Sequence, residues 1–289
     1  MNRASTSGEH GLLPANISIG RVRLRIADLD RAREFYVQRL GLQSFESSPE
    51  AAAFGPAGGH AIVRVHRVHG TRKRPESTPG LYHFAILFPD RASLAHVVAH
   101  LRESHWPFHG FADHGVSEAA YLADPDGNGV ELYVDRPRDE WPRSNGGIAM
   151  YSQPLDLPSL LGEAGASTQP GAPAATRIGH MHLHVSDLVR AERFWAGNIG
   201  FTVTTRDYPG ALFLAAGGYH HHIGLNTWAR NRTRPSDVAG LLDFSIHTGS
   251  TADRDAVRSR LDEQGIAYTE TEEGLALEDP EGNGVVITA

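Results

Sequence analysis

The sequence predicts an α+β protein in which four βαβββ units follow one another along the chain. Three observations lead to this prediction. A segment of the first half recurs in the second half, each copy changes from strand-like alternation to helix-like spacing, and hairpin motifs of similar composition end the second and fourth units. The units are expected at residues 17–70, 80–136, 176–230 and 240–289.

The duplication is visible near the start of each half. Residues 21–41 recur as residues 180–200. The identical pairs are Leu24 and Leu183, Asp28 and Asp187, Leu29 and Leu188, Ala32 and Ala191, Phe35 and Phe194, and Gly41 and Gly200. A fixed offset over such a stretch is typical of a duplicated half.

Each copy is expected to form a strand and then a helix. The opening residues alternate, and Asp28 stands where a helix N-cap is favoured. Leu29, Ala32 and Phe35 then recur at helical spacing, and Gly41 suits the end of the helix. Short strands and glycine-containing turns follow in both copies, which completes a βαβββ unit.

The second unit is expected to begin with a strand at 80–86, to contain a helix near 90–104 and to end with a hairpin at 124–135. Its counterpart begins at 240–246 and ends at 279–286. The motif Asp-Pro-Asp-Gly-Asn-Gly in the first hairpin predicts a turn, because proline fixes φ while glycine and asparagine tolerate positive φ.

The units are expected to form two domains in chain order. The first domain is residues 17–136 and the second is residues 176–289. Residues 137–175 between them are rich in Pro, Gly, Ser and Ala, which is typical of a linker. One short helix is expected inside this linker at 157–164.

The composition excludes several classes of function. With 40% hydrophobic and 21% charged residues among 289, the chain is expected to be globular. The absence of cysteine excludes disulfides, thiolate metal sites and a cysteine nucleophile, and the net charge of -7 argues against an extended nucleic-acid surface. Because neither a long apolar run nor a signal-peptide pattern is found, we expect a cytoplasmic protein that does not contact membranes.

A lone acidic residue, Glu131, follows the turn of the first hairpin. Successive side chains of a strand point to opposite faces, so Val130 and Leu132 are expected on one face and Glu131 and Tyr133 on the other. The sequence therefore predicts a carboxylate on one face of the second unit's sheet, and the histidines suggest a reason for it.

Histidine is unusually frequent, with 17 residues, and it is the commonest neutral metal ligand. Alternation predicts His180, His182 and His184 on one strand face. In the run 220–222, the same rule places the first and third histidines together and His221 on the opposite face. The third unit is therefore expected to present up to five histidines to one cavity, not all of which can be ligands.

The βαβββ units, the Asp-Pro-Asp-Gly-Asn-Gly-Val-Glu motif and the Ile-Gly-His start of the third unit together resemble the vicinal-oxygen-chelate superfamily, specifically its two-domain extradiol branch of catechol 2,3-dioxygenases. The resemblance covers the chain apart from its first fifteen residues and the linker. It implies cup-shaped mixed sheets and one iron(II), with manganese(II) as an alternative, bound between two adjoining units. A catechol-type or hydroquinone-type diol and O2 would be the substrates, and a homo-oligomer is compatible with it.

The family takes two histidines from first strands and one glutamate from a last strand, a set that leaves open positions on iron(II). The first-strand positions here hold, in chain order, Arg21, His83, His180 and Asp243. Glu131 has Val286 as its counterpart in the fourth unit. The resemblance therefore implies His83, Glu131 and His180 as ligands. Since the family's usual set comes from the third and fourth units, this chain departs from the pattern, and we expect the second unit to complete the cup of the third.

The resemblance also implies three catalytic residues. Tyr121 stands ten residues before Glu131, as in extradiol enzymes, and His114 lies upstream of it in a His-Gly-Val-Ser context, at a spacing shorter than in some relatives. His222 stands at the aligned place of the family's acid/base histidine, in a run followed by an apolar strand.

Two other functions remain open at this stage. A glyoxalase-type lyase or isomerase using zinc or nickel shares the fold but typically employs more than one carboxylate. A non-catalytic module that binds a small aromatic compound would need neither ligands nor acid/base groups. Taken singly, His83 and Glu131 also fit a purely structural role, and His182 and His184 fit cavity lining and packing equally well.

Overall fold

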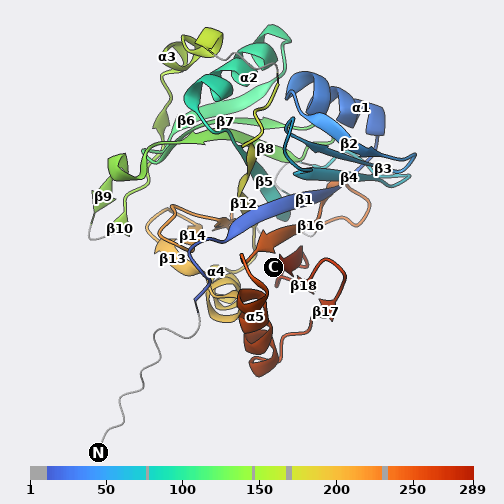
Figure 1. Cartoon of the computed structure of the whole chain (residues 1–289), viewed down its shortest axis with the longest axis vertical. Coiled ribbons are helices and arrows are strands. Elements are labelled where there is room, and N and C mark those ends of the chain that lie inside the picture. Colours follow the sequence, from blue (N-terminus) through green and yellow to red (C-terminus); the bar gives the residue numbers. More distant parts are fainter. Residues whose placement is uncertain (1–11, 76–77, 145–146, 167–170, 230–233) are drawn as a thin grey trace, which may run out of the picture.

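Two large mixed β-sheets form the body of the molecule in a computed structural model, which describes residues 12–75, 78–144, 147–166, 171–229 and 234–289 (Figure 1). The nine-stranded sheet has the order β11 (Gln153–Pro154), β6 (Phe108–Asp113), β7 (Ser117–Ala123), β8 (Gly129–Asp135), β5 (Gly80–Leu87), β12 (Arg177–His184), β15 (Ile223–Asn226), β14 (Ala211–Ala215), β13 (Thr202–Thr205). The eight-stranded sheet has the order β17 (Thr269–Glu270), β18 (Leu275–Glu278), β19 (Gly284–Thr288), β16 (Gly240–His247), β1 (Ser18–Ile26), β4 (Val63–Arg67), β3 (Ala51–Gly55), β2 (Gln43–Ser47).

Each sheet joins two units through their first strands. The nine-stranded sheet combines the second and third units, because β5 pairs antiparallel with β12. The eight-stranded sheet combines the first and fourth units through β1 and β16. The chain-order halves, 17–136 and 176–289, therefore each contribute strands to both sheets. The α+β class and the repeated units predicted from the sequence are confirmed.

The helices begin where the sequence provides N-caps. Their bounds are α1 (Leu29–Arg33) continued by the π-helical η1 (Glu34–Arg39), α2 (Arg91–Glu103), α4 (Leu188–Glu192) continued by the π-helical η4 (Arg193–Ile199), and α5 (Thr251–Glu263). The carboxylate of Asp28 accepts hydrogen bonds from the backbone N–H groups of Asp30 and Arg31, and Asp90 caps α2 in the same manner. None of these described helices is long and apolar enough to span a membrane.

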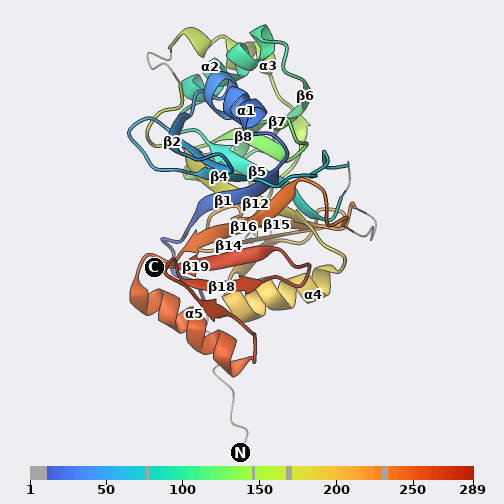
Figure 2. The ribbon, with the colours of Figure 1, turned by 90° about the vertical axis from the view of Figure 1, so that its right-hand side faces the viewer.

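The helices cover the outer faces of the two sheets, at opposite ends of the molecule. Figure 2 shows α1, α2 and α3 at one end and α4 and α5 at the other, with the central strands between them. Strand β1 contacts β12 where the two sheets meet. Large aromatic side chains on the helical segments, such as Phe35 on η1 and Trp195 on η4, are buried, and each contributes about 1.5–3 kcal/mol through the apolar surface removed from water.

The linker is more structured than its composition predicts. It contains η2 (Arg138–Glu140), β9 (Arg143–Ser144), β10 (Gly147–Ile148), β11 (Gln153–Pro154), α3 (Leu157–Leu161) and η3 (Ala164–Ala166). The predicted helix at 157–164 begins at Leu157 but ends at Leu161, because the chain continues through Gly162 into a separate short turn. Strand β11 pairs with β6 and becomes the edge of the nine-stranded sheet, so part of the linker belongs to the sheet that carries Glu131.

The turn before β8 fixes where that strand begins. The Oδ1 atom of Asp124 accepts hydrogen bonds from the N–H groups of Asp126 and Asn128 at 2.9 and 2.8 Å, while Oδ2 accepts from the Asn128 amide and from the Tyr36 hydroxyl. Gly127 has φ of 86°, which favours glycine. Burial raises the pKa of the Asp124 carboxyl to about 6, despite these hydrogen bonds. The turn thus aligns the strand that carries Glu131.

We expect the change Asp124→Ala to lower the free energy of unfolding by about 2–4 kcal/mol, because it leaves several buried donors without an acceptor. The change Tyr36→Phe removes one of these hydrogen bonds and should cost only about 1 kcal/mol. Urea unfolding of both variants measures the difference. Equal losses in the two variants would show that the turn hydrogen bonds do not hold this hairpin.

Candidate metal centre

Three neighbouring strands bring together the three side chains that the resemblance implied as ligands. His83 lies on β5, Glu131 on β8 and His180 on β12, and these strands are adjacent in the nine-stranded sheet. The Oε2 atom of Glu131 lies 2.9 Å from Nε2 of His83 and 3.1 Å from Nε2 of His180. One potential ligand atom from each side chain lies within 4.8 Å of the others, and all three residues are buried.

The charges of this group match what a metal ion requires. Burial alone would raise the pKa of Glu131, but the charge and hydrogen bond of His180 and the close approach of His83 outweigh it and hold that pKa well below its usual range. Burial lowers the pKa of His83, although Glu131 partly opposes this. A carboxylate beside a neutral imidazole is the protonation state in which these groups bind a metal.

The donor geometry also fits a metal ion. Among the described residues, Nε2 of His83 is buried without a hydrogen-bond partner, since its approach to Glu131 lacks hydrogen-bond alignment. Unpaired buried nitrogen atoms are costly and call for an explanation. A site with two imidazoles and one carboxylate, and room for further ligands, suits iron(II) or manganese(II). The residues present therefore fit the metal that the resemblance implies.

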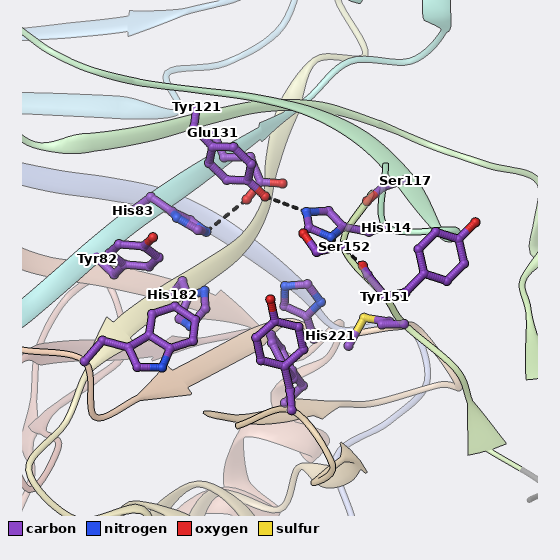
Figure 3. A pocket seen from close by; sticks show the side chains of 14 residues that line it. Tyr82, His83, His114, Ser117, Tyr121, Glu131, Tyr151, Ser152, His182 and His221 are labelled. Carbon is purple, nitrogen blue, oxygen red and sulfur yellow. Dashed lines mark hydrogen bonds and ion pairs between the residues drawn. The ribbon is translucent and has the colours of Figure 1, made fainter. Parts of the chain in front are cut away.

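A pocket with a cavity volume of about 220 Å³ opens beside the three residues (Figure 3). Its side walls are aromatic and come from several segments: Tyr82, Tyr208, Phe213 and Trp228. Figure 3 shows His83, Glu131 and Tyr121 along one side and His182 and His221 opposite them. The volume is small among ligand pockets, which is in keeping with a single aromatic ring.

Tyr121 and His114 both line this pocket and are joined to one another. Nε2 of His114 lies 2.7 Å from the Tyr121 hydroxyl, and Nδ1 lies 2.8 Å from the backbone carbonyl of Tyr151. Because a carbonyl can only accept, a neutral His114 carries its proton on Nδ1 and accepts the Tyr121 O–H at Nε2. Burial and the nearby Glu131 raise the pKa of Tyr121 well above its usual value, so it remains a phenol.

The linker supplies a wall of the pocket, which the sequence did not indicate. Met150, Tyr151 and Ser152 line it, and the hydrogen bond from His114 ends on the linker backbone. A backbone carbonyl carries no sequence signal. The position of the linker beside the pocket follows from the pairing of β11 with β6, and a two-residue strand is too short to predict from the sequence.

The prediction that His222 faces the cavity is wrong. Among the described residues of this run it is His221, and not His222, that lines the pocket. The His222 ring packs against Tyr219 and Phe201, its Nδ1 accepts a hydrogen bond from the Ala216 N–H at 3.3 Å, and burial lowers its pKa to about 3. Residues 219–222 precede β15, so the strand pattern gave the alternation but not the face.

The remaining histidines of the third unit take separate roles. His182 lines the pocket, and its Nε2 lies 3.0 Å from the Asn226 amide nitrogen. His184 instead lies 2.5 Å from the Asn226 oxygen through its Nδ1. Gly179 explains the Gly-His start of the unit, because a Cβ atom there would lie 1.7 Å from the Tyr133 hydroxyl. The close approach of Tyr133 to β12 therefore requires glycine.

Ion pairs occupy the equivalent position in the eight-stranded sheet. Nη1 of Arg21 lies 2.7 Å from Oδ1 of Asp243, and Nε of Arg23 lies 2.6 Å from its Oδ2. Arg21 and Asp243 stand at the first-strand positions that hold His180 and His83 in the other sheet. The buried carboxylate here is neutralised by arginine.

We expect Glu131→Ala and His180→Ala each to remove the metal. Changes around the ligands of a metal already cost about 10–100-fold in affinity, so loss of a ligand should cost roughly 100-fold or more. Metal content after loading with iron(II), measured by elemental analysis, tests this. Asp243→Asn, at the equivalent place in the other sheet, should retain one metal per chain, and full metal content in either ligand variant would exclude the shared site.

Comparisons with known proteins agree with this architecture. The model of the "Glyoxalase/Bleomycin resistance protein/Dioxygenase superfamily" matches residues 18–132 and 177–287. The catechol-2,3-dioxygenase of Bacillus subtilis (strain 168) is 41% identical over 268 residues, which cover 91% of this chain and 93% of that protein. The biphenyl-2,3-diol 1,2-dioxygenase 3 of Rhodococcus globerulus is 35% identical over 94 residues, covering 32% and 44%.

Solved structures share the fold at low sequence identity. A putative dioxygenase from Bacillus subtilis subsp. subtilis str. 168 has a TM-score of 0.64 at 13% identity, covering 93% of this chain and 84% of its own. Glyoxalase I from Zea mays has a TM-score of 0.56 at 19% identity, covering 94% and 92%. At these identities the likeness concerns the fold alone.

Proposed function

The chain belongs to the glyoxalase/bleomycin resistance protein/dioxygenase superfamily, the vicinal-oxygen-chelate family expected from the sequence, and on that premise we propose that it is an extradiol dioxygenase. It would open the ring of a catechol-type diol with O2 at one iron(II) held by His83, Glu131 and His180. The convergence of these three buried side chains at the end of an aromatic pocket carries the proposal. The 41% sequence identity to the catechol-2,3-dioxygenase of Bacillus subtilis, over 91% of this chain, supports the proposal.

The metal would supply open coordination positions for both substrates and would raise the acidity of a coordinated hydroxyl. Manganese(II) accepts the same nitrogen and oxygen donors. The protein must keep the carboxylate ionised, and the histidine contacts that depress the pKa of Glu131 do this. The metal-binding group is therefore ready for a divalent cation at neutral pH.

The pocket would bind and orient the aromatic ring. Phe213, Tyr208 and Trp228 offer flat apolar surfaces, against which a planar ring packs favourably. Their contribution is to exclude water and to hold the diol edge toward Glu131. Tyr82, which also contacts His83 and His182, extends this wall toward the opening.

Polar side chains beside the metal group would handle protons. Tyr121, which lines the pocket and donates its O–H to His114, would accept a hydrogen bond from a substrate hydroxyl at its oxygen, and His114 would orient it. Burial and neighbouring histidines hold the pKa of His221 well below its usual value, so its imidazole is neutral. Because the His221 imidazole lines the pocket, we assign to it the acid/base role first expected for His222.

We expect His221→Phe to keep its iron but to lose about 10²–10⁴-fold in kcat, the usual contribution of a general acid/base group. His222→Phe should retain most of the turnover, because its ring lies among Tyr219 and Phe201. Steady-state O2 uptake with catechol, together with iron analysis, measures both. A large loss in His222→Phe with normal turnover in His221→Phe would reverse the assignment.

Loading with iron(II) without oxygen, followed by catechol and then air, separates the rival functions. A dioxygenase should consume O2 and form a yellow ring-opened product. Binding of catechol to the metal-free protein, with no O2 uptake after loading, would favour a binding module. A glyoxalase-type lyase or isomerase would likewise not consume O2. Such enzymes typically use more than one carboxylate, whereas Glu131 is the single carboxylate in the group of His83, Glu131 and His180 found among the described residues.

A further inference from the structure

A chain of buried side chains leads from the pocket histidine to a carboxylate on another strand. Nδ1 of His221 lies 2.8 Å from Nδ1 of His220, and Nε2 of His220 lies 2.9 Å from Oδ1 of Asp135. Asp135 ends β8, the strand that carries Glu131. The third unit's histidine pair is therefore tied to the second unit by a contact separate from the metal group.

The hydrogen bonds fix where the protons lie. A carboxylate can only accept, so Nε2 of His220 donates to Asp135. With one proton on its ring, His220 then presents an unprotonated Nδ1, and His221 must donate its own Nδ1–H to it. The other nitrogen of His221, Nε2, is left without a proton.

Neighbouring groups hold Asp135 and His220 in place. The Tyr219 hydroxyl lies 2.9 Å from Oδ2 of Asp135 and donates to it, and its oxygen accepts from the Tyr133 hydroxyl, also at 2.9 Å. Burial raises the pKa of both tyrosines well above their usual value, so both remain donors. The Asp135 side chain is 24% exposed, whereas that of His220 is 0% exposed.

The linker closes this network from outside. The Trp141 ring lies 5.3 Å from that of His220, and the guanidinium of Arg138 lies 5.6 Å from both the Trp141 and the Tyr219 ring centres. Such cation–π contacts hold the Arg138 side chain over the two rings. The histidine pair is therefore shielded from water, which would otherwise compete for its hydrogen bonds.

The adjacent histidine provides an internal contrast. The Ala216 N–H donates to Nδ1 of His222, so a neutral His222 carries its proton on Nε2. His221 and His222 thus hold opposite tautomers although they are neighbours in sequence. The difference follows from what faces each Nδ1, a backbone donor in one case and an acceptor backed by Asp135 in the other.

We propose that Asp135 and His220 are positioning residues that hold His221 in its Nδ1–H tautomer, with the Nε2 lone pair free for a substrate proton. The part played in turnover rests on the proposed dioxygenase function, whereas the tautomer does not. The arrangement follows a general rule, since the hydrogen bond made by one ring nitrogen of a histidine decides the state of the other.

The isosteric change Asp135→Asn tests the proposal. The carboxamide oxygen would still accept from Tyr219, which leaves its NH2 group facing Nε2 of His220. His220 must then protonate Nδ1 and donate to His221, which would switch to the Nε2–H tautomer. Nε2 of His221 would then carry a proton and no lone pair would face the pocket, although the side chains keep their positions.

Two measurements follow this switch. Nitrogen-15 NMR of histidine-labelled full-length protein loaded with zinc(II) distinguishes protonated from unprotonated ring nitrogens, with His221 assigned from a His221→Gln spectrum. We expect its Nε2 to change from unprotonated to protonated in Asp135→Asn. In the iron-loaded enzyme, kcat for catechol should fall at least about tenfold while KM changes less than about twofold, and Asp237→Asn, in the exposed ion pair with Arg72, should change neither.

A second variant protects the test against a folding defect. His220→Phe removes the acceptor for His221, so it should lower kcat to a similar degree, and adding Asp135→Asn to it should have little further effect because the two act as one unit. An unchanged His221 tautomer in Asp135→Asn, or additive losses in the double variant, would overturn the proposal. If neither the wild-type protein nor any variant consumes O2, the proposed dioxygenase function is wrong. The NMR result still decides the tautomer of His221.

Discussion

The antiparallel pairing of β5 with β12 is the contact on which the functional site depends. It joins the second and third units across the linker and places His83 and His180 on neighbouring strands, with Glu131 on the next strand, β8. Every other feature of the site is built on this pairing, including the aromatic pocket and the link from His221 to Asp135. If these strands were separated, each unit would carry an incomplete set of ligands.

The two sheets share one architecture, but the buried carboxylate in each has different neighbours. In the nine-stranded sheet, a buried carboxylate faces two imidazoles, and this set is suited to a divalent cation. In the eight-stranded sheet, Asp243 faces Arg21 and Arg23, which neutralise it directly. A buried charge without a partner would be strongly destabilising, and each sheet provides partners for its carboxylate, imidazoles in one and guanidinium groups in the other.

The repeats made the architecture and the clustering of His83, Glu131 and His180 predictable, because each residue could be compared with its counterpart in another unit. Glu131 stood out against Val286, and His83 and His180 against Asp243 and Arg21. The comparison could not choose between His221 and His222, since the chain at 219–222 is irregular. Nor could it find Tyr151, which acts through a backbone carbonyl, or Asp135, whose contact with His220 depends on side-chain packing.

We propose that the second and third units, which lie on either side of the linker, share one metal held by His83, Glu131 and His180. Anomalous diffraction at the iron absorption edge, from crystals of the iron-loaded protein, tests this claim most directly. We expect one strong peak per chain in contact with His83, Glu131 and His180. A peak in the eight-stranded sheet near Asp243, or one that contacts residues of a single unit only, would contradict it.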